Sequence, residues 1–364
     1  MHIVTLNPGS STLKMALYVN GKKTAQKKLD HVSDFSVGVK KICEQLADFK
    51  IDAVGCRVVH GGSFSKPAIV NETTILELEK LNELAPLHNP PAITTIASAQ
   101  KLFGKKTPVV AVFDTMFHQT LPNYVTKYAL PKKWLEKYPI KRYGFHGLAH
   151  EYMHQRYCKL TGQSLATIIT LQLGSGCSAC AIKQGRSVDT TMGFTPLEGL
   201  VMRTRSGSID PAIIEYITRK ENITVSKVIQ LLNTDSGLAG LTGTNGDMRQ
   251  IQSDYKKNDP NAKIAFNLFA YTVKKQIGAY MAALNTTEAV VFGGGIGEHS
   301  PITRTRILSG LSPLNITIDV DKNSDVVIKE GEISAHGSNV KVYVIPVDES
   351  CIIHKYTKQV LEIK

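Results

Sequence analysis

Two short loops of this chain look like copies of each other, and this repetition constrains the fold more than any other feature of the sequence. The first loop lies in the run NPGSSTLK at residues 7–14, and the second lies in LQLGSGCS at residues 171–178. An apolar β-branched run precedes each loop, and a second strand-like run follows it. This pattern predicts a β-hairpin at both places. One such hairpin opens each half of the chain, which indicates a duplicated fold.

The two predicted hairpins share their far turns as well as their loops. Their second strands, expected at residues 15–19 and 179–182, end at Asn20-Gly21 and Gln184-Gly185. A glycine- and serine-rich loop between two strands offers a concave row of backbone N–H groups beside hydroxyl groups, and that chemistry suits phosphate oxygens. The pair of hairpins therefore predicts a fold that grips one phosphate chain from both sides.

Strand-like and helix-like segments alternate along the rest of the chain. The expected strands are residues 51–59, 109–113 and 288–292, and the expected helices are residues 74–85, 91–102 and 263–284. Such alternation predicts an α/β fold of mixed sheets covered by helices. No low-complexity linker separates the halves, and proline and lysine cluster at residues 115–150, where we expect the boundary.

Composition and charge narrow the class of protein. The chain has 364 residues, enough for two domains with their own cores. It contains no run of about 18 apolar residues, so we expect no membrane span, and it enters a strand without a targeting segment, so we expect a cytoplasmic protein. The net charge is +12, but the densest basic and aromatic stretch, residues 132–142, lacks an RNA-binding signature. We therefore expect this stretch to be a solvated surface segment, and we expect no nucleic acid as a partner.

Two metal- or redox-like spacings have structural interpretations. The run HEYMH at residues 150–154 matches H-E-x-x-H, which binds zinc when a helix places two imidazoles one turn apart, and His146 extends the spacing by a further turn. No third ligand is evident, so we favour a chance match. Cys177 and Cys180 have a C-x-x-C spacing, but we expect them on a strand, where residues three apart point to opposite faces.

Charged residues follow several apolar strands. Arg57 ends one of them, and Arg203 and Arg205 lie two apart beside a glycine turn. Guanidinium groups suit bidentate binding of phosphate and carboxylate groups. Asp114 and Glu349 also follow apolar runs, and carboxylates at strand ends that face phosphate commonly hold Mg²⁺.

With these residues in view, the chain resembles the acetate kinase (acetokinase) family of short-chain carboxylate kinases. Ten ordered motifs carry the resemblance, at residues 7–14, 57–62, 85–91, 112–120, 143–147, 192–200, 207–211, 247–249, 294–298 and 345–349. Ten motifs in one order are far more specific than any one of them. The resemblance argues against a zinc site at residues 150–154.

The resemblance implies a fold and a reaction. The fold is the duplicated actin-like/sugar-kinase, ribonuclease H-like α/β architecture, with two domains around a nucleotide cleft. The first domain would comprise residues 1–116 with a returning helix at 351–364, and the second residues 117–350. The reaction moves a phosphoryl group between ATP and acetate, giving ADP and acetyl phosphate, with Mg²⁺ or Mn²⁺. Family members are usually homodimers.

The resemblance also assigns residues to roles. It implies the catalytic residues Arg57, Asp114, His146 and Arg205, and the metal-site residues Asn7 and Glu349. The acyl group would contact Arg57, Val59, Leu87, Phe145 and Pro196. The nucleotide would contact Lys14, Gln172, Gly174, Ser175, Gly176, Asp247, Met248, Arg249, Gly294, Gly295, Ile296 and Gly297. The pair Gly295-Ile296 leaves room for a purine, which favours ATP over pyrophosphate as the donor.

The chain departs from the family pattern at the second loop. Gln172 stands where the family usually has histidine, and Ser175 where it usually has asparagine. A charged donor forms a hydrogen bond about twice as strong as a neutral one, so Gln172 weakens the loop's hold on phosphate. Arg203 stands where glycine is usual and Ser208 where aspartate is usual. Arg203 either supplies the charge that Gln172 lacks or points to solvent.

Two alternatives to acetate phosphorylation remain open. One is a preference for propionate or another short-chain acid, because a methylene group changes binding by only about 1–3 kcal/mol in a pocket. The other is a catalytically weakened relative that binds nucleotide or acyl phosphate, which the altered second loop alone favours.

Overall fold

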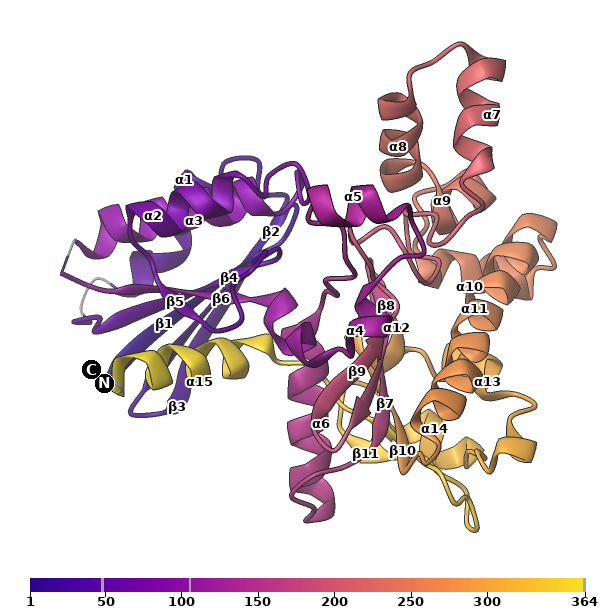
Figure 1. Cartoon of the computed structure of the whole chain (residues 1–364). Helices are drawn as coiled ribbons and strands as arrows, with labels where there is room; N and C mark the ends of the chain where they lie inside the picture. Colours follow the sequence, from indigo (N-terminus) through magenta and orange to yellow (C-terminus); the bar gives the residue numbers. More distant parts are fainter. Residues whose placement is uncertain (47–48, 105, 363–364) are drawn as a thin grey trace. The chain divides into compact units, whose positions relative to one another are not determined.

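The chain forms two compact units in a computed structural model that describes residues 1–46, 49–104 and 106–362 (Figure 1). Unit 1 holds Met1–Gln119, Phe145–Tyr152 and the segment from Asp348 onward, and unit 2 holds Thr120–Gly144 and Met153–Val347. The sequence-based division placed residues 145–152 in the second domain. They join unit 1 because Gly147 lies against the carbonyl of Asp114 and Leu148 is part of the core of unit 1.

The sheet of unit 1 has the order β3-β2-β1-β4-β6-β5. Its strands are β1 (His2–Pro8), β2 (Thr12–Val19), β3 (Lys22–Asp30), β4 (Ala53–Val58), β5 (Ala68–Ile69) and β6 (Val109–Phe113). Strands β3, β2 and β1 pair antiparallel, β1, β4 and β6 pair parallel, and β5 closes the edge antiparallel to β6.

The sheet of unit 2 repeats this order strand for strand. Its strands are β7 (Ile168–Leu173), β8 (Cys177–Lys183), β9 (Arg186–Thr190), β10 (Ala289–Gly293), β11 (Gly331–Glu332) and β12 (Lys341–Val344). Strands β9, β8 and β7 pair antiparallel, β7, β10 and β12 pair parallel, and β11 is the antiparallel edge. The predicted duplication is confirmed, and the first two strands of each sheet form the predicted hairpin.

Helices cover both faces of the sheet of unit 1. Helices α1 (Phe35–Cys43), α2 (Glu72–Glu79) and α3 (Asn89–Phe103) lie on one face, and α15 (Glu349–Glu362) lies on the other, as Figure 1 shows. Short 3₁₀ turns lie at Glu44–Leu46 and Asp114–Thr120. Helix α15 approaches closely because Gly55 of β4 leaves room for Ile353 and Thr357.

In unit 2, α11 (Pro260–Leu284) packs on β8 and buries Phe266, Phe269 and Ile277. Helix α6 (Gly147–Thr161) begins in unit 1 and continues in unit 2, where Tyr157 contacts Tyr343 of β12 edge-on. The other helices of unit 2 are α4 (Asn123–Thr126), α5 (Lys132–Lys137), α7 (Ala212–Glu221), α8 (Val225–Thr234), α9 (Gly237–Thr242), α10 (Met248–Lys256), α12 (Gly294–His299), α13 (Pro301–Leu308) and α14 (Val320–Asp325). A 3₁₀ turn lies at Ser312–Leu314.

Local signals predicted most elements correctly. The turns Asn20-Gly21 and Gln184-Gly185 both have two consecutive positive φ angles (48° and 81°, 48° and 78°), as a two-residue hairpin turn requires. The helix predicted at residues 74–85 was too long, since α2 ends at Glu79 and tighter turns follow. Proline at position 86 disfavours helical backbone in the residue before it. Among the described residues, no helix has the length and apolar character needed to cross a membrane.

The packing of α15 on β4 gives a stability prediction. A Cβ at Gly55 would lie 2.1 Å from Thr357 Oγ1 and 2.8 Å from Ile353 Cγ2, so Gly55→Ala should reduce the free energy of unfolding by about 1–3 kcal/mol. At Gly278 of α11 a Cβ meets no atom within 4 Å, so Gly278→Ala should be neutral or stabilising by up to about 1 kcal/mol. Urea unfolding midpoints measure both, and equal midpoints for the two variants would contradict the close approach of α15.

Candidate functional site

A buried ion pair lies at the centre of the polar network of unit 1. Arg57 lies on β4, and Asp114 directly follows the neighbouring parallel strand β6, so both lie at the carboxyl end of the sheet. Arg57 Nε donates to Asp114 Oδ1 at 3.0 Å and Nη2 donates to Oδ2 at 2.6 Å. The side chain of Asp114 is 0% exposed and that of Arg57 is 11% exposed. This two-point contact fixes the plane of the guanidinium group.

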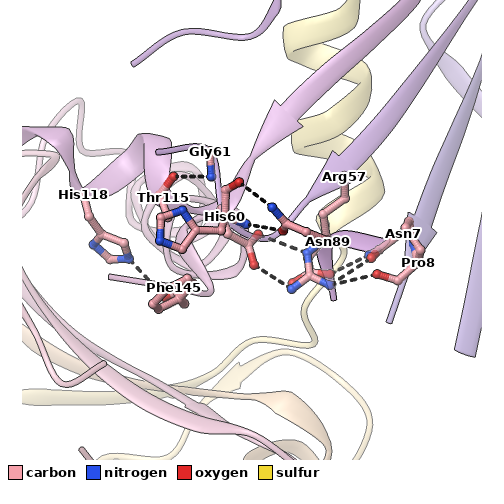
Figure 2. A network of polar contacts seen from close by, with 11 residues as sticks. Asn7, Pro8, Arg57, His60, Gly61, Asn89, Thr115, His118 and Phe145 are labelled. Atoms are coloured by element: carbon pink, nitrogen blue, oxygen red, sulfur yellow. Dashed lines mark hydrogen bonds and ion pairs between the residues drawn. The ribbon is translucent and has the colours of Figure 1, made fainter. Parts of the chain in front are cut away.

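The network continues from Arg57 to two further elements. Arg57 Nη1 donates to Asn7 Oδ1 at 3.2 Å and to the Pro8 carbonyl at 3.5 Å. Asn7 Nδ2 then donates to Glu349 Oε2 at 2.6 Å. Figure 2 shows Arg57 directed towards Asn7 and Pro8 at the end of β1. The structure therefore brings together Asn7, Arg57, Asp114 and Glu349, which the sequence analysis had selected separately.

The two carboxylates of this network have pKa values shifted in opposite directions. Burial raises the pKa of Asp114, the nearby Glu349 carboxylate adds to the rise, and the Arg57 guanidinium opposes both. Burial also opposes ionisation of Glu349, but Arg57, Lys14, the Asn7 amide and His146 together hold the pKa of Glu349 below its usual range. Lys14 is placed for this role because it pairs with Asn7 across the β1–β2 hairpin. Glu349 is thus the more strongly ionised oxygen donor.

His146 is held in a strained backbone conformation against Asp114. Its φ angle is +57°, a left-handed value that few residues other than glycine adopt. The Asp114 carboxylate accepts a hydrogen bond from the His146 backbone. The next residue, Gly147, has no room for a side chain, because a Cβ there would lie 1.9 Å from the Asp114 carbonyl oxygen. Surrounding contacts thus fix His146 at the start of α6, and such strain often marks a functional residue.

Supporting residues that the sequence analysis assigned no role lie beside this network. His60 and Asn89 exchange two backbone-to-amide hydrogen bonds of 3.0 Å, and Thr115 accepts from the Gly61 N–H at 3.1 Å. His118 Nε2 donates to the Phe145 carbonyl at 3.0 Å (Figure 2). His60, Asn89, Thr115 and His118 all lie within the motifs that carried the resemblance, which was the available signal.

The predicted acyl-pocket residues of unit 1 differ in exposure. Val59 and Phe145 are buried, and the ring of Phe145 meets His60 edge-on at 5.5 Å between centroids. Leu87 is 47% exposed, so it can contact a bound molecule. Pro196 lies in unit 2, where its carbonyl accepts from Arg205 Nη1 at 3.1 Å. Burial lowers the pKa of the Arg205 guanidinium, which stays charged at neutral pH.

The second hairpin loop lies beside the start of α12. The Gly174 N–H donates to the Gly176 carbonyl at 3.1 Å, and the Cβ position of Gly174 is 3.9 Å from the backbone nitrogen of Gly295. Gly294 has a positive φ of 76°, and a Cβ there would lie 2.6 Å from the Leu173 carbonyl oxygen, so no side chain fits at this position. The structure therefore brings the predicted loop residues together with the predicted run Gly294, Gly295, Ile296 and Gly297. Gln172 is the residue before the last in β7, and its Oε1 is buried without a hydrogen-bond partner in the described part of the chain.

A cavity of about 400 Å³ in unit 2 is lined by Thr244, Asn245, Asp247, Arg249 and Gln250. Asp247 caps α10 and accepts from the Arg249 backbone N–H at 2.9 Å and from Arg249 Nη2 at 2.5 Å. The contacts with Arg249 lower the pKa of Asp247 to about 2. Two of the predicted nucleotide residues thus line one cavity, while Met248 is buried beside them.

The oxygen donors in unit 1 fit a hard divalent ion that arrives with phosphate. Glu349 provides a carboxylate, and Asn7 turns its amide nitrogen to that carboxylate and its amide oxygen, which has two lone pairs, to Arg57. Mg²⁺ typically takes one or two protein carboxylates together with substrate phosphates and water. In contrast, residues 1–46, 49–104 and 106–362 contain no cluster of three or more His, Cys, Asp or Glu residues that could hold a metal. In the H-E-x-x-H run, Glu151 accepts from Lys355 and Tyr356. Cys177 and Cys180 are buried, free and on β8, as expected.

Comparison with known proteins identifies the family. A model of the acetokinase family matches residues 10–355. The chain belongs to the acetokinase family. It is 42% identical to the acetate kinase of Halothermothrix orenii over the full length of both chains, and 41% identical to that of Brachyspira hyodysenteriae, covering 96% of this chain and 97% of the relative.

Solved structures agree with this assignment. The acetate kinase of Porphyromonas gingivalis superposes with a TM-score of 0.90 at 34% identity, covering 99% of both chains. A propionate kinase from Francisella tularensis also gives a TM-score of 0.90, at 38% identity, covering 98% of this chain and 99% of the other. The predicted actin-like kinase fold is therefore confirmed. As an acetokinase, the chain is a phosphotransferase that moves a phosphoryl group between ATP and a carboxylate with a divalent metal ion.

Burial of His118 gives a prediction of pH dependence. Burial lowers the pKa of His118 from 6.5 to about 4. Since the unfolded chain binds this proton more readily, stability should fall as the pH drops from 6.5 towards 4, by up to about 1.4 kcal/mol per unit from this group. His118→Gln, which cannot titrate, should lose less stability between pH 7 and pH 4.5. Urea unfolding at each pH measures this.

The exposed His336 provides the matched control for His118. His336→Gln should follow the pH dependence of the wild-type chain. A His118→Gln curve parallel to wild type would mean that His118 is not held neutral by burial.

Proposed function

We propose that this chain phosphorylates acetate with Mg²⁺ and ATP, in a reversible reaction, through the network around Arg57. The observation that carries the proposal is the buried Arg57–Asp114 pair and its extension through Asn7 to Glu349. It supplies a fixed guanidinium group, a strained histidine and an oxygen-donor pair, which are the parts that phosphoryl transfer to a carboxylate needs.

The chemistry requires positioning and positive charge rather than a base. A carboxylic acid with a pKa near about 4–5, as for Asp and Glu, is ionised at pH 7, so no proton has to be removed from the attacking oxygen. The barrier comes from bringing two anions together and from the charge on a loose, metaphosphate-like phosphoryl group. Fixed donors aimed at developing charge lower that barrier. The site accordingly offers Arg, His and backbone N–H groups and no catalytic triad.

Each candidate site residue of unit 1 has a proposed part in this chemistry. Arg57 binds the oxygens of the phosphoryl group or of the substrate carboxylate, and Asp114 holds its guanidinium plane. His146 donates a hydrogen bond to the phosphoryl oxygens. Asn7 and Glu349 hold Mg²⁺, which neutralises phosphate charge when bound. Val59, Leu87 and Phe145 contact the acyl methyl group.

The residues of unit 2 have proposed parts in binding the nucleotide, and Arg205 supplies a second guanidinium group. Arg205 binds phosphoryl or carboxylate oxygens, and its contact with the Pro196 carbonyl supports a part for Pro196 in the acyl pocket. Asp247 and Arg249 bind the nucleoside in the cavity that they line. The loop residues Gly174, Ser175 and Gly176 bind phosphate, and Lys14 of unit 1 is proposed separately as a phosphate-binding residue. We further propose a cytoplasmic homodimer, and the six free cysteines fit a reducing compartment.

A substrate panel tests the function. Acyl phosphate formed by the purified chain is trapped with hydroxylamine, with acetate, propionate or butyrate as acceptor and with ATP or pyrophosphate as donor. We expect kcat/KM to be highest with acetate and ATP, because the small apolar pocket rejects longer chains by about 1–3 kcal/mol per methylene.

Other results of this panel select a different function. A higher kcat/KM with propionate would make the chain a propionate kinase, like its relative from Francisella tularensis. If none of the pairs of donor and acceptor gives product, the chain is a relative that binds its ligands without turnover. Acyl phosphate with pyrophosphate but not with ATP would remove the nucleotide role.

The metal role of Glu349 gives a separate prediction. Glu349→Gln keeps the shape of the side chain but removes its charge, so the Mg²⁺ concentration for half-maximal activity should rise by about 10- to 100-fold. A chelator should abolish activity, and added Mg²⁺ should restore it. The exposed Glu136 provides the control Glu136→Gln, which should leave the Mg²⁺ dependence unchanged. Activity restored by Zn²⁺ but not by Mg²⁺ would contradict the assignment.

A further inference from the structure

Arg203 lies where three backbone segments of unit 2 meet. Its N–H donates to the carbonyl of Ser175, in the second phosphate loop, at 3.1 Å. Its own carbonyl accepts from the Ala239 N–H at 2.8 Å, and the Met202 carbonyl accepts from Leu238 at 2.9 Å. The backbone of Arg203 is therefore fixed to the phosphate loop on one side and to α9 on the other.

Two glycines allow this close approach. Gly246 has a φ of +70°, and a Cβ there would lie 2.6 Å from the Arg203 carbonyl. Gly237 has a φ of +59°, and a Cβ there would lie 2.3 Å from the Met202 carbonyl. Side chains at either position would push the Arg203 segment away, so its place beside the phosphate loop is built into the packing.

The side chain of Arg203 reaches a residue that lines the cavity. Its Nε donates to the carbonyl of Asn245 at 2.8 Å, and Asn245 lines the cavity together with Asp247 and Arg249. Among the described residues, neither Nη group of Arg203 has a hydrogen-bond partner, so both keep their donors for a bound group. Arg203 thus contacts both the predicted phosphate turn, at Ser175, and a residue that lines the predicted nucleoside cavity, Asn245.

The nearby acid is already bonded to another arginine, so the Arg203 guanidinium group can bind a phosphate. Asp247, whose pKa the Arg203 charge helps to lower, already accepts two side-chain hydrogen bonds from Arg249. Gln172, at the base of the phosphate loop, is a neutral amide. A phosphate bound at this loop therefore has Arg203 as a nearby cation with free donors, and a guanidinium fork suits the bidentate binding of phosphate.

We propose that Arg203 is a nucleotide-binding residue that contacts the polyphosphate where it leaves the nucleoside cavity. The inference rests on the proposed nucleotide role of that cavity. It also decides between the two sequence-based interpretations of Arg203, in favour of a contact with the nucleotide over a side chain in solvent.

A comparison of ADP with adenosine tests the proposal. Binding of each to the full-length chain is measured by calorimetry in Mg²⁺ buffer, for wild type, Arg203→Gln and Arg203→Lys. We expect Arg203→Gln to weaken ADP binding at least about tenfold, because a hydrogen bond to a charged group is lost. Adenosine has no phosphate, so its binding should change less than twofold. Arg203→Lys should lie between, since it keeps the charge but loses the fork.

Kinetics and a matched variant complete the test. The KM for ATP should rise in Arg203→Gln while the KM for acetate stays unchanged. Raised salt should weaken ADP binding more in wild type than in Arg203→Gln, because salt screens the Arg203 charge and the variant no longer has that charge. The exposed Arg186 gives the control Arg186→Gln, which removes the same charge at the end of β8 opposite to the phosphate loop and should leave ADP binding unchanged.

Defined outcomes overturn the proposal. If Arg203→Gln weakens ADP and adenosine equally, Arg203 shapes the cavity through Asn245 and does not contact phosphate. If neither affinity changes, Arg203 has no part in binding. A wild-type chain that binds no ADP and forms no acetyl phosphate would instead refute the proposed function, whatever the variants do.

Discussion

The bidentate contact between Arg57 and Asp114 is the interaction on which the polar network of unit 1 depends. Removing two charges from water is strongly unfavourable, and the pair is stable only because its geometry is close and its remaining donors and acceptors are used. Here those remaining groups bond Asn7, the Pro8 carbonyl and the His146 backbone. The requirement to satisfy one buried ion pair thus also orders β1, β4, β6 and the start of α6.

The duplicated sheets explain why polar groups collect at equivalent places in both units. In each sheet the first hairpin strand pairs parallel with the next strand, so its loop lies at the same sheet edge as the carboxyl ends of the parallel strands. Unit 1 has charged partners at that edge, in Arg57 and Asp114. Unit 2 instead has the neutral Gln172 there, and the arginines considered for this site, Arg203 and Arg205, lie in the segment before α7. The same architecture therefore carries two different charge patterns.

Sequence reasoning succeeded where a short segment contains its own signal. The turn Asn20-Gly21 and the glycines of both loops act through their own backbone angles, so they could be recognised directly. It failed at the end of α2, where the tight turns before Pro86 replaced helix, and it gave no role to His118 or Asn89. Those two residues act through partners 27 and 29 positions away, Phe145 and His60. Their bonding depends on packing, which no local pattern specifies.

The sequence by itself determined the α/β class, the duplication, the two hairpins and the family, because these follow from periodicity, turn chemistry and ordered motifs. The tertiary structure decided which polar residues act together. Asn7 and Glu349 are 342 positions apart in the chain but share a hydrogen bond of 2.6 Å. It also joined the Arg203 backbone to Ser175 and the Arg203 side chain to Asn245, since only folding brings residues 175, 203 and 245 together. The physical reason is that hydrogen bonds and charges act over a few ångströms in space, whatever the separation along the chain.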